Sequence, residues 1–137
     1  IAFIGNSGAP GCSTGPHLHL EIQRDGASVN PAGYLSARDV VWDNAPDSSF
    51  SFTGDLVWPI ESPRITQGFG MTHWAQTGFY SGRPHTGIDM TSGSGDAIKA
   101  MVDGTLYRGT VSCGSSPMNF VAIDHSNGVV SWYWHVQ

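Results

Sequence analysis

Residues 14–22, with the sequence TGPHLHLEI, alternate between polar and apolar side chains. From His17 onward every second residue is polar (His17, His19 and Glu21), and the residues between and after them are leucine or isoleucine. Alternation over this length predicts a β-strand with one face in a hydrophobic core. A strand rises about 3.3 Å per residue, so the two imidazoles lie roughly 7 Å apart, which suits one metal ligand beside one general acid or base. Taken alone, the pattern is more typical of an ordinary amphipathic strand.

The composition predicts one mostly β domain rich in turns. The chain has 137 residues, enough to bury a core, and it contains 18 glycines and 8 prolines. Charged residues make up 12% of the chain, against about a quarter in typical proteins. Long helical periodicity is missing, and two hairpins are predicted instead, at residues 97–108 around Asp103-Gly104 and at residues 119–136 around Asn127-Gly128. The predicted fold class is therefore antiparallel β-sheet.

The charge of the chain argues against a nucleic-acid partner, and its hydropathy argues against a segment that spans a membrane. The formal net charge is −5 and Lys99 is the only lysine, which argues against binding to nucleic acid. The sequence has no run of 18 apolar residues, so no transmembrane segment is predicted.

The two cysteines, Cys12 and Cys113, each lie in a loop rich in glycine and serine. Their spacing fits no metal or redox motif. Two free thiols and one disulfide that closes a long loop are both compatible with the sequence.

Periodicity is lost over residues 36–55, and residues 43–49 have the composition of a linker. The sequence therefore predicts two segments joined by a linker. Residues 1–35 contain the His-x-His strand, and residues 56–137 contain the other candidate site residues.

A second cluster of chemically active residues is His85-Thr86-Gly87-Ile88-Asp89. The glycine and the two β-branched residues argue against a helix, but a loop that runs into a strand can still direct His85 and Asp89 to one ion. Joined by His19, they would make a site of three protein ligands. Three ligands plus water is the arrangement of a catalytic zinc, whereas a structural zinc has four protein ligands.

A third candidate, His135, ends the more regular hairpin in the sequence Trp132-Tyr133-Trp134-His135. Strand alternation predicts it on the face of Tyr133, with the two tryptophans opposite. Taken alone, it is more typical of a histidine at a sheet edge.

Three motifs together resemble the LytM-type zinc endopeptidases, the lysostaphin-like M23 metallopeptidases of peptidoglycan. They are residues 85–89 (HTGID), residues 13–21 (STGPHLHLE) and residues 133–135 (YWH). Residues 65–70 and 29–31 match flanking patterns of the family. The resemblance covers most of the chain except the linker and the loop before His85. It implies an antiparallel sheet with the LytM/M23 fold. It also implies an enzyme that hydrolyses peptide bonds in the stems or cross-links of bacterial peptidoglycan.

Residue by residue, the resemblance assigns His19, His85 and Asp89 to Zn²⁺. It makes His17 and His135 the histidines that transfer protons and stabilise the oxyanion. These roles are expectations carried over from the family.

Further expectations follow from the same resemblance. Tyr80 is the nearest candidate for a tyrosine that family members carry before the first zinc histidine, and it is equally a candidate for an aromatic residue of the substrate groove, with His73 and Trp74. The loops of Cys12 and Cys113 would lie near the site, and the cell envelope, extracellular or periplasmic, would permit their disulfide.

The order of the two halves departs from the family. In the family the His-x-x-x-Asp half comes first, whereas here residues 1–35 resemble the C-terminal half and residues 56–137 the N-terminal half. A circular permutant and a window cut from tandem repeats both explain this order, the second slightly better. The halves would then assemble within one chain or swap between two chains in a dimer.

Two non-catalytic functions compete with the peptidase. A cell-wall-binding or hydrolase-regulating module on the same fold would usually lack zinc ligands, and here none is missing. A β-rich carbohydrate-binding module would account for five tryptophans and four tyrosines without a metal.

Overall fold

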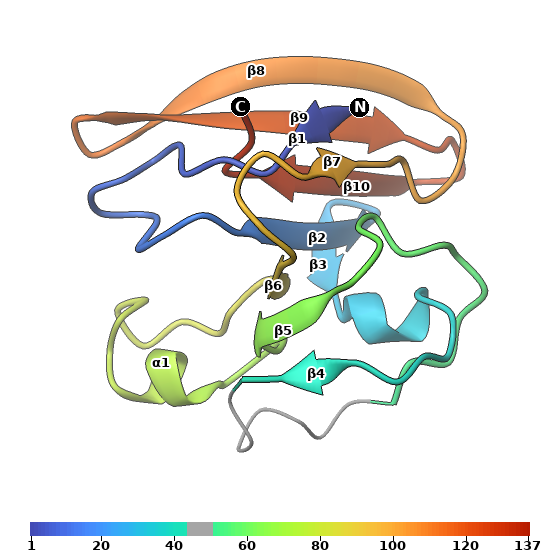
Figure 1. The fold of residues 1–137 in the computed structure, drawn as a ribbon, viewed down its shortest axis with the longest axis horizontal. Helices are drawn as coiled ribbons and strands as arrows, with labels where there is room; N and C mark the ends of the chain where they lie inside the picture. The colour runs from blue at the N-terminus through green and yellow to red at the C-terminus, as the bar shows by residue number, and fades with distance from the viewer. Residues whose placement is uncertain (44–50) are drawn as a thin grey trace.

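The predicted His-x-His strand lies in the middle of the sheet. It is β2 (Leu18–Arg24), which pairs antiparallel with β10 (Val129–Trp134) along one edge. Its other edge is shared by β6 (Ile88–Thr91) and the short β3 (Ala27–Val29). In this computed structural model, which describes residues 1–43 and 51–137, strands dominate, and the prediction of a mostly β protein is confirmed (Figure 1).

The main sheet has the order β4-β5-β6-β2-β10-β9-β8, with β3 paired to β2 beside this path. Only the β4–β5 pair of this sheet is parallel among the described residues. A second, two-stranded sheet joins β1 to β7. The remaining strands are β1 (Ala2–Phe3), β4 (Val41–Trp42), β5 (Arg64–Gln67), β7 (Ala97–Ile98), β8 (Thr105–Cys113) and β9 (Ser116–Asp124).

Helices are few and short in residues 1–43 and 51–137. The structure has the 3-10 helix η1 (Pro31–Gly33) and the one-turn helix α1 (His73–Gln76), which Thr72 caps by accepting a hydrogen bond from the Ala75 backbone N–H. In the part of the chain that the structure describes, no helix has the length and apolar character to cross a membrane.

One face of β2 is in the hydrophobic core and the other carries the polar residues. Leu18 and Leu20 are 0% exposed and Ile22 is 1% exposed, as the alternation predicted. Neighbouring strands add to the same core, for example through Ile88, Met90, Val121, Ile123 and Tyr133. The opposite face is therefore the one on which His19 and the adjacent Asp89 meet.

The two predicted hairpins have different outcomes. The hairpin of β9 and β10 is confirmed, with Val130 opposite Asp124. The hairpin at residues 97–108 is wrong, because β7 pairs with β1, and β8 pairs with β9 instead. Gly104 does not form the predicted turn. A Cβ atom there would lie 2.5 Å from the backbone O of Asp124, so glycine is needed for close backbone approach.

The predicted linker, residues 36–55, is partly packed into the fold. β4 extends the main sheet, and Phe52 lies in the core with its ring centroid 4.7 Å from that of Trp58. Gly54 passes so close to Tyr34 that a Cβ atom would lie 2.0 Å from its backbone O. Residues 44–50, most of the predicted linker composition, lie outside the described residues.

The two ends of the chain lie side by side (Figure 1). Ile4 and Val136 form an antiparallel bridge, and the backbone N–H of Gln137 donates to the Phe3 carbonyl at 3.1 Å. This pairing brings His135 next to the loop that precedes β2.

Cys12 and Cys113 are joined by a disulfide that ties this loop to the end of β8. We expect the double variant Cys12→Ser/Cys113→Ser to lose about 4 kcal/mol of unfolding free energy, because the bond closes a loop of about 100 residues. Urea denaturation of the variant and of the oxidised wild type measures the difference, and reduced wild type should match the variant. Equal midpoints for all three would contradict a stabilising bond.

Candidate metal centre

Three side chains from two neighbouring strands and one loop converge on the polar face of the sheet. His19 of β2 lies directly opposite Asp89 of β6 in the antiparallel register. His85 precedes β6 in a loop that two backbone hydrogen bonds with Gly70, of 2.8 and 2.9 Å, hold in place. The pairing of β2 with β6, and of the His85 loop with Gly70, therefore brings these three predicted site residues together.

Their donor atoms fit one metal ion. His19 Nδ1 lies 2.8 Å from Asp89 Oδ1, and His85 Nε2 lies 3.0 Å from His19 Nδ1 and 3.2 Å from Asp89 Oδ1. Ligands 2.0–2.1 Å from a tetrahedral zinc are about 3.3 Å apart, so shifts of a few tenths of an ångström would accommodate the ion. The set of two imidazoles and one carboxylate also matches the ligand types of catalytic zinc.

Gly87 makes room for this arrangement. A Cβ atom at residue 87 would lie 2.3 Å from the backbone O of Leu20 and 2.9 Å from Nε2 of His19. A side chain there would push the loop away from β2 and separate His85 from His19. The sequence suggested only that this glycine opposes a helix.

Supporting hydrogen bonds orient His85 and Asp89. His85 Nδ1 lies 2.6 Å from the Gly68 carbonyl, which can only accept, so this nitrogen carries the proton and Nε2 keeps its lone pair for a metal. Gln67 donates from Nε2 to Asp89 Oδ2 at 2.9 Å and accepts from the Thr72 hydroxyl at 2.7 Å. A register shift between Ile65 and Gln67 places Gln67 opposite Asp89.

Gln67 and Thr72 were missed by sequence analysis. Gln67 lies within residues 65–70, which the sequence marks only by their resemblance to a flanking family pattern, and the register shift that directs its side chain to the site leaves no trace in the sequence. Tyr80, a predicted site residue, lies beside them: its hydroxyl accepts a hydrogen bond from Gln67 at 2.6 Å, and its ring stacks on His85 with centroids 5.5 Å apart.

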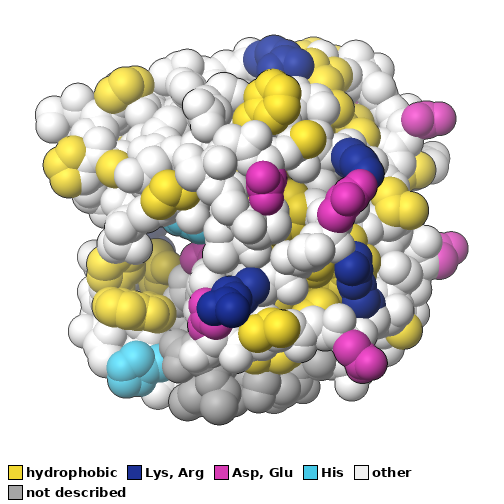
Figure 2. Space-filling model, in the orientation of Figure 1, with side chains coloured by type: hydrophobic (Ala, Val, Ile, Leu, Met, Phe, Trp, Pro, Cys, Tyr) yellow, Lys and Arg dark blue, Asp and Glu magenta, His cyan; other side chains and the backbone are white. Residues whose placement is uncertain are grey.

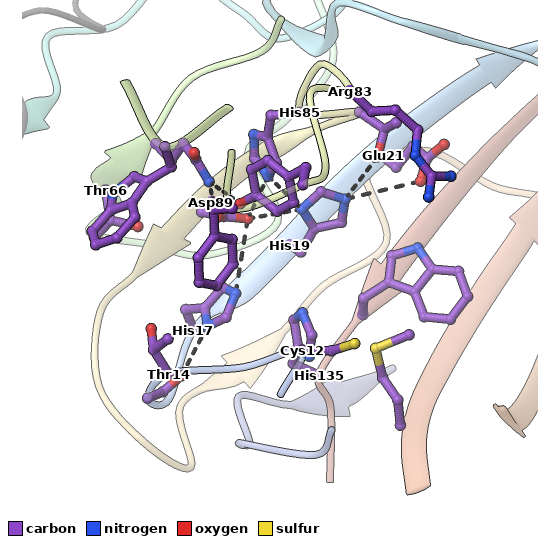
Figure 3. A pocket seen from close by; sticks show the side chains of 18 of the residues that line it. Cys12, Thr14, His17, His19, Glu21, Thr66, Arg83, His85, Asp89 and His135 are labelled. Carbon is purple, nitrogen blue, oxygen red and sulfur yellow. Dashed lines mark hydrogen bonds and ion pairs between the residues drawn. The ribbon is translucent and has the colours of Figure 1, made fainter. Parts of the chain in front are cut away.

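His17 and His135 lie beside the three converging donors (Figure 3). Their ring centroids are 4.5 Å apart, and His17 Nε2 lies 3.8 Å from Asp89 Oδ1. Each Nδ1 lies 2.8 Å from a backbone carbonyl, of Gly15 for His17 and of Ser7 for His135. A carbonyl can only accept, so Nδ1 of each ring carries a proton directed at its carbonyl, and Nε2 faces the pocket.

The prediction that His135 shares a face with Tyr133 is wrong. β10 ends at Trp134, and His135 has φ 65°, in the left-handed region, so the alternation of the strand stops before it. Tyr133 is in the core, whereas the His135 ring is turned toward His17 and lines the site pocket. A non-glycine residue in this conformation is uncommon and often marks a functional position.

Burial and neighbouring groups shift the pKa values of His19, Asp89 and His135 in the metal-free chain. Burial alone would lower the pKa of His19, but the hydrogen bond to Asp89 and the nearby carboxylate of Glu21 raise it to about 9. Burial would raise the pKa of Asp89, but His85 and His19 hold it well below its usual range. Burial, together with neighbouring His17, lowers the pKa of His135 to about 4, so this ring is neutral at neutral pH.

These shifts predict that the chelator-treated chain is most stable near pH 6.5. His19 keeps its proton up to about pH 9 when folded, so the stability it contributes is present below pH 6.5 and lost as pH rises to 9. His135 resists protonation down to about pH 4, so stability also falls between pH 6.5 and 4. Each change amounts to about 3 kcal/mol.

Urea denaturation with EDTA at pH 4, 6.5 and 9 tests this profile. In the variant His135→Gln, the unfolding free energy should fall much less between pH 6.5 and 4. It should still fall between pH 6.5 and 9. Unfolding free energies that are equal at all three pH values would contradict both shifts.

A pocket of about 820 Å³ opens above the converging side chains. Figure 2 shows it as a hollow at the left of the molecule, with histidine and acidic side chains inside and hydrophobic side chains at its margin. Trp74, Phe79 and Tyr80 line one part and Trp134 another. The predicted groove residue His73 is not among its lining residues.

Comparisons of the chain with models of protein families, with curated proteins and with solved structures find no match in any of the three.

Proposed function

We propose that the chain is a zinc-dependent endopeptidase that hydrolyses peptide bonds in the stems or cross-links of bacterial peptidoglycan. One observation carries the proposal: the donor atoms of His19, His85 and Asp89 all lie within 4.8 Å of one another, beside two histidines that are not part of this group. The family resemblance of the three motifs supplies the substrate class and the expected extracellular or periplasmic location.

His19, His85 and Asp89 would hold the metal. Bound there, zinc supplies a Lewis acid for the scissile carbonyl and lowers the pKa of water toward 7. The remaining chemistry belongs to His17 and His135. His17 accepts a proton at Nε2 from the attacking water and returns it to the leaving amine, and this nitrogen lies 3.8 Å from Asp89 Oδ1.

His135 has a different task. Its Nδ1–H donates a hydrogen bond to the Ser7 carbonyl. Because its pKa is about 4, the ring is neutral at neutral pH and has a lone pair at Nε2. Such a ring orients a hydrogen-bond donor, for example the attacking water. Donation to an oxyanion would need a second proton on this ring, which burial and the neighbouring His17 oppose, so His135 acts as a hydrogen-bond acceptor.

Cleavage of purified peptidoglycan tests the proposed activity. The chain, loaded with one equivalent of zinc, should release new amino groups and shortened peptides that mass spectrometry identifies, and EDTA should stop the release. Zinc added back should restore it. A zinc-loaded, folded chain that releases no peptide fragments from peptidoglycan of several cross-link types would contradict the proposal.

A non-catalytic cell-wall-binding module is the second candidate. Trp132 and Trp134 stack with ring centroids 5.3 Å apart and an interplanar angle of 6°, and Phe120 packs against both. Such aromatic surfaces bind sugars and peptides without a metal. Pelleting with peptidoglycan in EDTA, without fragment release under any condition, would favour this function over the peptidase.

A further inference from the structure

Glu21 is a buried carboxylate on the same face of β2 as His19. It is 7% exposed, and its Oε1 accepts hydrogen bonds from Gln23 Nε2 at 3.0 Å and from the hydroxyl of Ser28. A buried charge is costly unless partners hold it, and here two neutral donors do so. None of the chemistry proposed above uses this residue.

His19 lies between two carboxylates (Figure 3). Its Nδ1 faces Asp89 at 2.8 Å, and its Nε2 lies 3.9 Å from Glu21 Oε2 and 3.5 Å from the Thr86 hydroxyl. Glu21 is therefore on the side of the ring away from Asp89. It is not in the group of His19, His85 and Asp89 whose donor atoms can reach one ion among the described residues.

An imidazole that binds a metal through Nδ1 must carry its proton on Nε2. A negative charge facing Nε2 stabilises that proton and makes Nδ1 a better electron donor. It also opposes rotation of the ring, because a flipped ring would place Cε1–H instead of Nε2–H opposite the carboxylate, and it opposes the other tautomer, whose Nε2 lone pair would face a negative charge.

We propose that Glu21 is a positioning residue, which holds His19 with its proton on Nε2 and its Nδ1 directed toward His85 and Asp89. This inference rests on the proposed metal site. It also gives β3 a function, because Ser28 of β3 pairs with Gln23 of β2, and both side chains hold Glu21. The β2–β3 hairpin thereby reaches the metal centre through one carboxylate.

The test compares Glu21→Gln with Glu61→Gln, the same change at an exposed glutamate whose partner is Lys99. Zinc affinity is measured by competition with a chromophoric chelator, after thermal denaturation has shown that each variant is folded. We expect Glu21→Gln to raise the Kd for zinc by about 10- to 100-fold, and Glu61→Gln to leave it unchanged. Ser28→Ala, which keeps the carboxylate but removes one of its holders, should raise the Kd by a smaller factor and serves if Glu21→Gln does not fold.

A second readout separates positioning from a merely structural role. In the zinc-loaded wild type, the Nε2–H proton of His19 should be visible by NMR and slow to exchange with water, and Glu21→Gln should accelerate its exchange. Wild type that binds zinc, with the same Kd and the same Nε2–H exchange in Glu21→Gln, would overturn the role of Glu21 alone. A wild-type chain that binds no zinc would overturn the proposed metal site and this role with it.

Discussion

Asp89→Asn should lower the affinity for zinc by more than about 100-fold. Removing a residue that merely hydrogen-bonds to a metal ligand already costs about 10- to 100-fold in affinity, and Asp89 is itself a proposed ligand. Asp89 supplies the only carboxylate of the donor group, and its Oδ1 lies 2.8 Å from His19 Nδ1 and 3.2 Å from His85 Nε2. Asparagine keeps the volume of the side chain but offers the cation a neutral oxygen. Peptide release should fall with zinc occupancy.

The matched control is Asp103→Asn, the same change at an exposed aspartate outside the pocket. It should leave both zinc affinity and cleavage at the wild-type level. Isothermal titration of the chelator-treated proteins with zinc measures the affinities. An Asp89→Asn variant that binds zinc as tightly as the wild type would remove Asp89 from the ligand set.

His17→Ala should lower the rate of cleavage by about 10³-fold while zinc stays bound, because the loss removes proton transfer and no ligand. The position of His17 explains why cleavage should be lost without loss of zinc. His17 Nε2 lies 3.8 Å from Asp89 Oδ1, farther than the roughly 3.3 Å between two ligands of one tetrahedral zinc. Its Nδ1–H donates a hydrogen bond to the Gly15 carbonyl.

His73→Ala, at an exposed histidine of α1 that does not line the pocket, serves as the control and should cleave at the wild-type rate. Initial rates at saturating substrate and zinc content by atomic absorption are measured for both variants. Unchanged cleavage by His17→Ala would show that its assigned role is wrong, and loss of zinc from this variant would place His17 among the ligands.

The central part of the fold could be predicted because local pattern and tertiary structure agree there. Alternation in residues 14–22 predicted which residues of β2 enter the core, and Asn127-Gly128 lies in the turn between β9 and β10. The β7 pairing could not be predicted, because Asp103-Gly104 has the composition of a turn while Gly104 in fact serves a close backbone contact.

The candidate site was predicted only as far as residue types and motif spacing reach. His19, His85 and Asp89 converge because β2 and β6 are neighbours, so their distance along the chain does not matter. Three details depend on geometry that no pattern carries. They are the register shift that brings Gln67 to Asp89, the left-handed backbone that turns His135 toward His17, and the β3 contact that holds Glu21.

The reversed order of the two segments is compatible with this site. Residues 1–35 supply β2 and residues 56–137 supply β6, β9 and β10, and one sheet contains all four. A complete donor group therefore forms within a single chain.

X-ray absorption at the zinc edge tests most directly whether distant parts of the chain bind one ion. We predict one zinc per chain, with nitrogen and oxygen ligands at about 2.0–2.1 Å and scattering from two imidazoles, reduced to one imidazole in His19→Ala. A wild-type chain without stoichiometric zinc, or an imidazole count that His19→Ala leaves unchanged, would contradict the account.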